Sequence, residues 1–398
     1  MPEDEFVYDP FSLAVRDNPY LLYRRLRKDY PLYRSATYDF WALSRFDDVQ
    51  LASRTWRVFS SAQGVDIDHS GEAIYGPGDL GNFIDSDPPI HTAFRKILQR
   101  EFLPAQLAKA LRPQVDKVVR TLLDALQDHD EVDLIADFAW VLPTTVMWTW
   151  LGCPESDFPL LRELLRRVKF RELGVPNLTA IASLAIIDLR EYMRGLIATR
   201  YDRPTTDLIS YLLHDRGGIG IPEPDRLEIT LNMSMLLIDA GTGTTAALLG
   251  NALHLLGDKM TQRQELLANP QKVNAAVEEA IRLESPVQHN MRTTTEAIDL
   301  HGQHLSAGSR ILLVFGAANR DERRWQDAEA FDINRPSLPH LGFGQGIHLC
   351  LGAPLARLEA TAALSEFLRR FPDYQLRNTA VRLPNLDRGF LSLPALLR

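Results

Sequence analysis

Phe343-Gly344-Gln345-Gly346-Ile347-His348-Leu349-Cys350-Leu351-Gly352 is a glycine-rich loop that closes on a cysteine and leads into a predicted helix. Glycine has no Cβ, so the backbone of such a loop can pass close to a flat, bulky group. Ala353 and Pro354 begin the helix, because proline is favoured in a first helical turn. The positive end of the helix dipole stabilises a thiolate at Cys350. The loop therefore predicts an exposed sulfur that is suited to bind a metal.

Only two cysteines, Cys153 and Cys350, occur in 398 residues, which excludes a disulfide framework or a cysteine-rich zinc site. A lone cysteine is usually a buried structural residue. Here, however, the loop resembles the haem loop of the cytochrome P450 family, Phe-x-x-Gly-x-(His/Arg)-x-Cys-x-Gly. The matching residues are Phe343, Gly346, His348, Cys350 and Gly352. The resemblance implies a bacterial, soluble haem-thiolate monooxygenase with haem b (iron protoporphyrin IX), Cys350 as axial iron ligand, and haem contacts from Phe343, Gly344, His348 and Gly352.

The bulk composition fits a globular enzyme. The chain is 45% hydrophobic and 24% charged with a net charge of −8, which argues against a nucleic-acid-binding protein. The acidic start, residues 1–5, has no apolar run behind it, so we expect neither a signal peptide nor a membrane anchor. The most apolar stretch, residues 231–256, contains Asp239 and several threonines and glycines, and it predicts a buried helix. We expect a cytoplasmic location.

The periodicity predicts one domain, residues 1–398, that is mainly α-helical with a small β region. We expect the helix-rich core at about 88–285 and 351–371, and the small mixed β region at about 30–45, 287–315 and 374–398. Breaks are predicted at Pro104, 152–154, 174–176 and 217–218, and a hairpin joins 32–35 to 40–43. The resemblance implies the cytochrome P450 fold, a triangular prism of long helices around haem.

A second motif, Ala240-Gly241-Thr242-Gly243-Thr244-Thr245, lies inside the long apolar helix. Threonine hydroxyls compete for backbone carbonyls and glycine weakens helices, so a local opening is predicted here. The family has Ala-Gly-x-(Asp/Glu)-Thr-Thr on the distal face, the side of the haem where dioxygen binds. The resemblance implies that Thr244, with Thr245, belongs to the catalytic proton network.

Gly243 stands where the family has its acid, and glycine carries no proton-transferring group. Protons must then arrive through Thr242, Thr244, ordered water or a polar group of the substrate, or else the reaction differs from plain hydroxylation. We hypothesise that oxygen activation is assisted by the substrate, and we count Gly243 among the catalytic positions because it lacks the acid.

Two sets of charged residues complete the resemblance. His91 and Arg95 lie at i and i+4 on one predicted helix face, a geometry that suits a haem propionate. By resemblance, the propionate donors are His91, Arg95, Arg292 and His348. Glu279 and Arg282 match the family's Glu-x-x-Arg, with Arg335 as third partner, and this set is expected to be structural.

The resemblance implies a substrate pocket between residues 60–83, 170–177, 287–290, the threonine helix and the tail near Phe390. Asp239 is costly to bury alone: it either bonds a neighbouring side chain or recognises an amine, guanidine or hydroxyl of the substrate. The expected substrate contacts are Leu236, Asp239, Ala240, Val287, Gln288, His289, Asn290 and Phe390. The four polar ones, Asp239, Gln288, His289 and Asn290, predict a functionalised substrate.

The sequence therefore predicts a monooxygenase that inserts one oxygen atom from O₂ into a C–H bond of a small molecule in secondary metabolism. Electrons are expected from a ferredoxin or flavodoxin with an NAD(P)H reductase, and the protein is expected to be a monomer that binds no nucleic acid and no membrane. Oxidative cyclisation, C–C or C–N coupling and peroxide-driven oxidation remain alternatives. A haem-based sensor is the non-enzymatic alternative.

Overall fold

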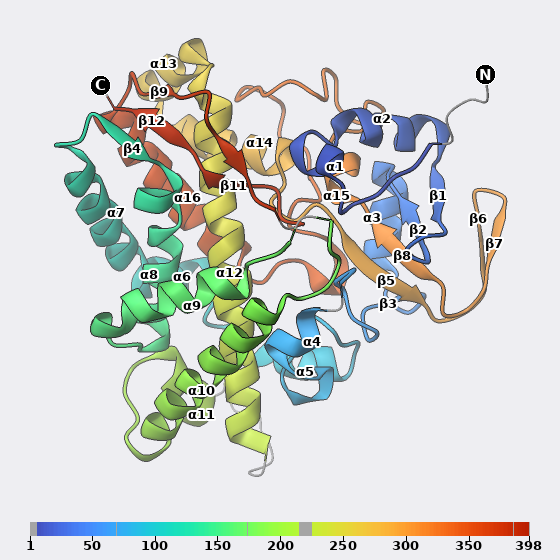
Figure 1. The fold of residues 1–398 in the computed structure, drawn as a ribbon, viewed down its shortest axis with the longest axis horizontal. Coiled ribbons are helices and arrows are strands. Elements are labelled where there is room, and N and C mark those ends of the chain that lie inside the picture. The colour runs from blue at the N-terminus through green and yellow to red at the C-terminus, as the bar shows by residue number, and fades with distance from the viewer. Residues whose placement is uncertain (1–5, 69, 173, 215–224, 385, 398) are drawn as a thin grey trace.

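The computed structural model describes residues 6–68, 70–172, 174–214, 225–384 and 386–397. Helices dominate, and Figure 1 shows many of them gathered around the long helix α12 (Arg226–Gly257), with a small sheet on the opposite side of the molecule. The predicted fold class, mainly α with a small β part, is confirmed.

Helix α12 forms the centre of the helical part because it is apolar on every face, as expected of a helix buried in a core. It packs against α8 (Val141–Leu151), α10 (Ala180–Asp202), α14 (Val273–Leu283) and α16 (Ala353–Arg370). The predicted opening at residues 240–245 is wrong, since α12 is continuous. The hydroxyls of Thr242 and Thr244 instead donate to the carbonyls of Ile238 and Ala240, each at 2.6 Å, and so follow the helix.

The helix ends follow the local sequence. Gly152 adopts a left-handed conformation (φ 86°) and caps α8, and Pro104 begins α6, as its missing N–H allows. The predicted break at 217–218 lies outside the described residues. The other helices are α1 (Leu13–Asp17), α2 (Tyr20–Asp29), α3 (Phe46–Arg54), α4 (Ser70–Tyr75), α5 (Ile90–Gln99), α6 (Pro104–Ala110), α7 (Arg112–Leu126), α9 (Phe158–Val168), α11 (Leu208–His214), α13 (Met260–Ala268) and α15 (Phe315–Ala318).

The main sheet has the order β1-β2-β8-β5-β3. The predicted hairpin is confirmed as β1 (Leu32–Ser35) and β2 (Phe40–Leu43), and β2 pairs in parallel with β8 (Arg310–Leu313). Strands β5 (Asn290–Thr294) and β3 (Phe59–Ser60) complete it. The tail does not join this sheet: β12 (Pro394–Leu396) pairs with β4 (Glu131–Asp133) and β9 (Gln375–Leu376), and β11 (Phe390–Ser392) pairs with β10 (Val381–Arg382). A separate hairpin joins β6 (Ile298–Leu300) to β7 (Gln303–Leu305).

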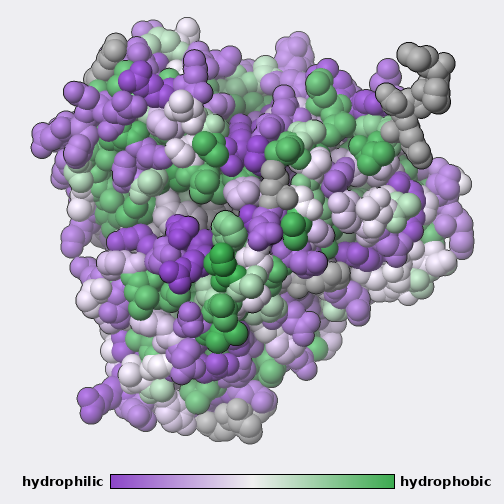
Figure 2. Space-filling model, viewed as in Figure 1, coloured by the Kyte–Doolittle hydropathy of each residue, from purple (hydrophilic) through white to green (hydrophobic). Residues whose placement is uncertain are grey.

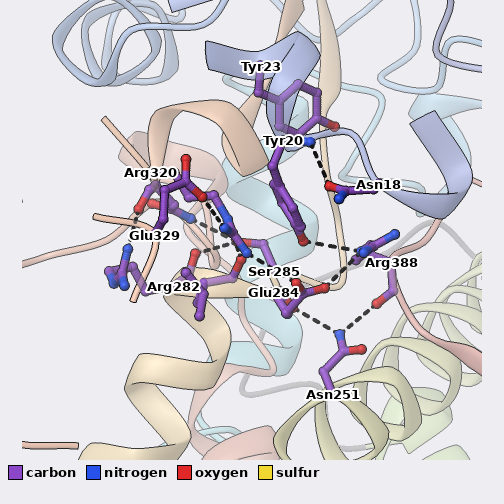
Figure 3. Close-up of polar contacts among 12 residues, drawn as sticks. Asn18, Tyr20, Tyr23, Asn251, Arg282, Glu284, Ser285, Arg320, Glu329 and Arg388 are labelled. Carbon is purple, nitrogen blue, oxygen red and sulfur yellow. Dashed lines mark hydrogen bonds and ion pairs between the residues drawn. The ribbon is translucent and has the colours of Figure 1, made fainter. Parts of the chain in front are cut away.

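A buried polar cluster joins helices α2, α12 and α14 to the C-terminal tail (Figure 3). Glu284, directly after α14, pairs with Arg388 of the tail at 2.8 Å and with Arg320 at 3.1 Å. Arg320 also stacks 3.3 Å from the ring centroid of Tyr20, and Asn251 of α12 donates to the carbonyls of Glu284 and Arg388. Burial alone would raise the pKa of Glu284, but its arginines lower it to about 2. The charges thus hold α2, α12, α14 and the tail in one arrangement.

The surface is of mixed character. Figure 2 shows hydrophilic residues over most of one face, with smaller hydrophobic groups between them. Among the residues that the structure describes, no helix combines the length and the apolar character needed to cross a membrane.

Candidate active site

The cysteine loop keeps a fixed shape through its own backbone. The N–H of Cys350 donates to the carbonyl of Phe343 at 2.9 Å, and Gly344 and Gly346 have φ of 66° and 72°. A Cβ at Gly346 would lie 2.3 Å from the carbonyl oxygen of Ser53, so only glycine permits this close approach to α3. The glycines therefore serve the loop's turn and its packing.

Cys350 lines a cavity, which we call the thiol cavity. Burial raises the pKa of the Cys350 thiol, and the N–H groups of Gly352 and Ala353 with Arg95 and Arg357 only partly oppose this. The predicted stabilisation by the helix end is therefore present but outweighed. A metal cation bound to the sulfur would shift this balance, because a coordinating thiol is deprotonated.

The walls of the thiol cavity are mostly apolar. Helix α12 supplies one wall, with Leu236, Leu237, Ala240, Gly241, Thr244, Thr245 and Leu248. Phe343, Gly344 and Gly352 lie in the same cavity beside Cys350. Expected residues from the two motifs, far apart in the chain, thus meet around one space.

Arginines mark the edge of the thiol cavity. Arg95 and Arg292 both line it, and neither forms an ion pair with a carboxylate within the described ranges. Burial lowers the pKa of Arg292 to about 10, and Asp87 and Asp85 partly offset this. Two cations at the edge of an apolar space suit a flat group that carries carboxylates.

The two predicted histidine donors pack on each other. The His91 and His348 rings are 4.5 Å apart, and only His348 lines the thiol cavity. Burial lowers the pKa of His91 to about 4 and that of His348 to about 2, so both rings are neutral at pH 7. Nε2 of His348 is buried without a hydrogen-bond partner in the described part of the chain. This orphaned atom and the arginines fit haem propionates, and a carboxylate there would raise both pKa values.

Glu279, Arg282 and Arg335 are in contact, as expected. Arg282 donates to both carboxylate oxygens of Glu279 at 2.8 Å, and Nε of Arg335 donates to Glu279 Oε1 at 2.9 Å. Arg282 also donates to the carbonyls of Asn319, Ala328 and Ala330. The set ties α14 to the segment that precedes the cysteine loop, and none of its members lines the thiol cavity.

A second, more polar cavity lies next to the first, and we call it the polar cavity. Six residues line both: Val65, Ile84, Ala240, Thr244, Val287 and Asn290. Its charged lining includes Asp66, Asp68, Lys169, Arg171, Asp239 and Asp387. Burial, with Asp68 and Asp85 nearby, raises the pKa of Asp66 to about 8.

Sequence reasoning expected the segments that wall the polar cavity but missed most of these charged side chains. Asp66, Asp68 and Arg171 lie inside the expected segments 60–83 and 170–177, whereas Lys169 lies one residue outside. No motif marks them; the one available signal is a charged residue set among apolar neighbours, as in Val65-Asp66-Ile67 and Val168-Lys169-Phe170.

Asp239 satisfies both of the alternatives left open by the sequence. It lines the polar cavity, and it is also bonded to neighbours: Oδ1 lies 2.7 Å from Nζ of Lys169, and Oδ2 accepts a hydrogen bond from the Tyr75 hydroxyl at 2.5 Å. Since both oxygens have partners, Asp239 is not a free receptor for a substrate amine.

Of the residues that follow α14, some only line the polar cavity, and one is also hydrogen-bonded within the protein. Val287, His289 and Asn290 line the polar cavity, and burial lowers the pKa of His289 to about 4. Gln288 lines it too, but its amide donates to the carbonyl of Ser285 at 2.6 Å and accepts from Tyr23 at 3.0 Å. Gln288 is therefore committed to the fold.

Phe390 is a wrong prediction. It lines neither cavity and is buried in the core beside α12, 3.7 Å from the position of a Cβ at Gly250, with Arg382 over its ring at 3.9 Å. The strand pairing of β11 turns this side chain into the core. The tail reaches the polar cavity through Pro384, Leu386 and Asp387 instead.

Comparisons with known proteins agree with this geometry. The family model described as "Cytochrome P450" matches residues 188–395. Cytochrome P450 130 of Mycobacterium tuberculosis is 34% identical over 380 residues, 93% of each chain. Cyclomarin C epoxidase CymV of Salinispora arenicola is 33% identical over 366 residues, 90% of each chain. The solved structure of the bacillaene polyketide synthase cytochrome P450 PksS of Bacillus subtilis 168 has a TM-score of 0.88 and 29% identity, and the match covers 98% of this chain and 100% of that one.

Proposed function

Because the chain belongs to the cytochrome P450 family, we propose that it inserts one oxygen atom from O₂ into a C–H bond of a functionalised small molecule in bacterial secondary metabolism. The single observation that carries the proposal is the junction of the two cavities at Ala240 and Thr244, within the thiol cavity that Cys350 lines. A substrate held by polar groups in one cavity can thus present a carbon atom to the other.

Haem b is the proposed form of the cofactor. Cys350 would hold its iron, and Arg95, Arg292, His348 and His91 would hold its propionates. Both ring nitrogens of His91 are buried without a hydrogen-bond partner in the described part of the chain. When bound, haem supplies the one-electron and dioxygen chemistry that amino-acid side chains lack. The apolar wall of α12 lowers the local dielectric constant of this space, which strengthens the electrostatic interactions inside it.

Thr244 is the proposed polar group of α12 at the reaction site. Its hydroxyl donates to the carbonyl of Ala240 at 2.6 Å, so its oxygen remains able to accept a proton-bearing partner from the cavity. Thr245 is buried and lines only the thiol cavity. Gly243 lines neither cavity, and therefore contributes only the absence of a side chain.

The names of two related proteins support the substrate class. One is a cyclomarin C epoxidase and the other a cytochrome P450 of a polyketide synthase. The charged lining of the polar cavity, together with His289 and Asn290, supports a substrate with heteroatoms. We further propose that electrons come from a ferredoxin or flavodoxin with an NAD(P)H reductase, and that the protein is a cytoplasmic monomer.

A spectral binding screen followed by turnover tests this proposal. Candidate metabolites with polar groups should shift the Soret band of the purified haem protein, and plain hydrocarbons of similar size should bind more weakly. With a surrogate ferredoxin and reductase, the product of a binding compound should gain the mass of one oxygen atom, labelled when ¹⁸O₂ is supplied. A product that has lost two hydrogens would instead indicate cyclisation or coupling. Turnover supported only by peroxide, or none at all, would contradict the proposal.

A further inference from the structure

The place where a side chain of residue 243 would lie is filled from another element. Gly243 is buried, and a Cβ there would lie 3.3 Å from Cε and 3.6 Å from Nζ of Lys169. Lys169 directly follows α9. Its side chain passes over the turn of α12 that contains Gly243. An acid at residue 243 would have to share this space with the Lys169 side chain.

The ammonium group of Lys169 pairs with the carboxylate of Asp239, which lies one helical turn before Gly243 on α12. Its Nζ lies 2.7 Å from Oδ1 of Asp239, and the Tyr75 hydroxyl holds the other oxygen. The exposed fractions of the Lys169 and Asp239 side chains are 18% and 8%, so water screens the pair weakly. We call Lys169, Asp239 and Tyr75 the α12 triad; it joins α4, the end of α9 and α12.

Both members of the ion pair are charged in the folded protein. Burial would lower the pKa of Lys169, but Asp239 and Asp387 outweigh it and raise that pKa above its ordinary value. Burial would raise the pKa of Asp239, but Lys169, Tyr75 and Arg171 outweigh it and lower that pKa. Lys169 is thus an ammonium ion that pairs with Asp239 by charge, and within the described residues Oδ1 of Asp239 accepts no hydrogen bond of regular geometry.

The pair faces the space that Thr244 also lines. Lys169, Asp239, Ala240 and Thr244 all line the polar cavity, and Thr244 lines the thiol cavity as well. Asp66, Asp68, Arg171 and Asp387 are the other charged groups of the lining nearest the pair. A hydrogen-bonded chain from the ammonium to Thr244 therefore needs to cross only this cavity.

We propose that the Lys169–Asp239 pair is the proton-holding group of this distal wall and replaces, one turn earlier on α12, the carboxylate that the family has at position 243. The inference rests on the proposed function. A proton passes from Nζ of Lys169 through cavity water toward Thr244 to the oxygen atom that the reaction reduces, and solvent returns one proton to the same nitrogen through the polar cavity. No electron moves and no bond to carbon changes in this proton transfer, and the negative charge of Asp239 favours the return of the proton to Nζ.

Moving the carboxylate tests the proposal. Asp239→Asn should lower the rate of product formation by roughly tenfold or more, since general acid–base groups contribute roughly 10²–10⁴-fold to a rate. The product formed per NAD(P)H should fall with it. Adding Gly243→Asp to that variant should restore most of the ratio, because Nζ of Lys169 already lies 3.6 Å from the position of the new Cβ. Ser234→Ala is the control: Ser234 is a buried hydroxyl residue of the same helix, donates to the carbonyl of Thr230 and lines neither cavity, so its ratio should stay unchanged.

Unfolding by urea gives a readout that needs no turnover. In the native background, Lys169→Met and Asp239→Asn should each destabilise the haem protein, and together no more than the worse of the two, because they remove one interaction. In the Asp239→Asn/Gly243→Asp background, Lys169→Met should destabilise the protein again. This result would show that Lys169 now pairs with the new carboxylate at residue 243.

The outcomes separate the two proposals. If Asp239→Asn keeps the native product ratio, the inference is wrong. It is also wrong if unfolding shows the ion pair rebuilt at residue 243 while the ratio stays low, since the triad then serves only to hold the three elements together. If the unaltered protein makes no oxygenated product from any bound compound, the proposed function fails instead, whatever the unfolding data show.

Discussion

Glu279→Gln should destabilise the protein strongly because it breaks a buried charge cluster. Glu279 is 5% exposed and accepts two bonds from Arg282 at 2.8 Å and one from Arg335 at 2.9 Å. It also accepts from the N–H of Asp332 at 3.1 Å. The substitution replaces one accepting oxygen by an NH₂ group that faces a guanidinium and leaves Arg282 without its counter-charge.

The size of the effect follows from the burial of the cluster. Removing one partner of a buried ion pair costs about 3–5 kcal/mol, because the remaining charge is uncompensated. Glutamine keeps one acceptor, so we expect about 3 kcal/mol, against a total of about 5–15 kcal/mol for a folded protein. Since Arg282 also holds the carbonyls of Asn319, Ala328 and Ala330, haem retention should fall together with stability.

The neighbouring residue offers a matched control. Glu278 pairs with Arg357 at 2.6 Å and lies 3.1 Å from Nε2 of His340, whose side chain is mostly buried. The Glu278 and Arg357 side chains are 38% and 43% exposed, and such exposed pairs contribute about 0–1 kcal/mol. Urea unfolding can be followed by tryptophan fluorescence, since Arg282 lies 5.5 Å from the Trp325 ring centroid. Equal unfolding midpoints for Glu279→Gln and Glu278→Gln would refute the reasoning.

Three further predictions concern the thiol cavity and a buried acid. Cys350→Ser removes the thiol, so the reduced protein under carbon monoxide should lose the absorption band typical of thiolate ligation; an unchanged band would point to another ligand. Arg292→Gln should lower severalfold the haem retained after gel filtration, and native retention would contradict its role. Burial raises the pKa of Glu359 to about 8. The native protein should therefore lose stability as the pH rises from about 4.5 to about 8, by roughly 5 kcal/mol at most, and Glu359→Gln should not. If the native protein and Glu359→Gln show the same pH dependence of stability in urea unfolding, the prediction for Glu359 is wrong.

Local patterns predicted the elements well because they depend on neighbours in the chain. The hairpin of β1 and β2 and the buried helix α12 follow from alternation and from an unbroken apolar run. The prediction that α12 opens was wrong, also for a local reason. A threonine hydroxyl can donate to the carbonyl one turn back without breaking the helix, and Thr242 and Thr244 do so. Phe390 was misplaced because the facing of a strand residue depends on its pairing partner.

By itself the sequence determined the chemical identity of the site, since the cysteine loop, the threonine motif and the Glu-x-x-Arg set are short and each is encoded by adjacent residues. Only the tertiary structure decided what surrounds Gly243. Lys169 is 74 residues from Gly243 in the chain, and Tyr75 is farther still, yet packing brings both to one turn of α12. The meaning of a missing side chain depends on what fills its space, and contacts between distant segments alone settle that.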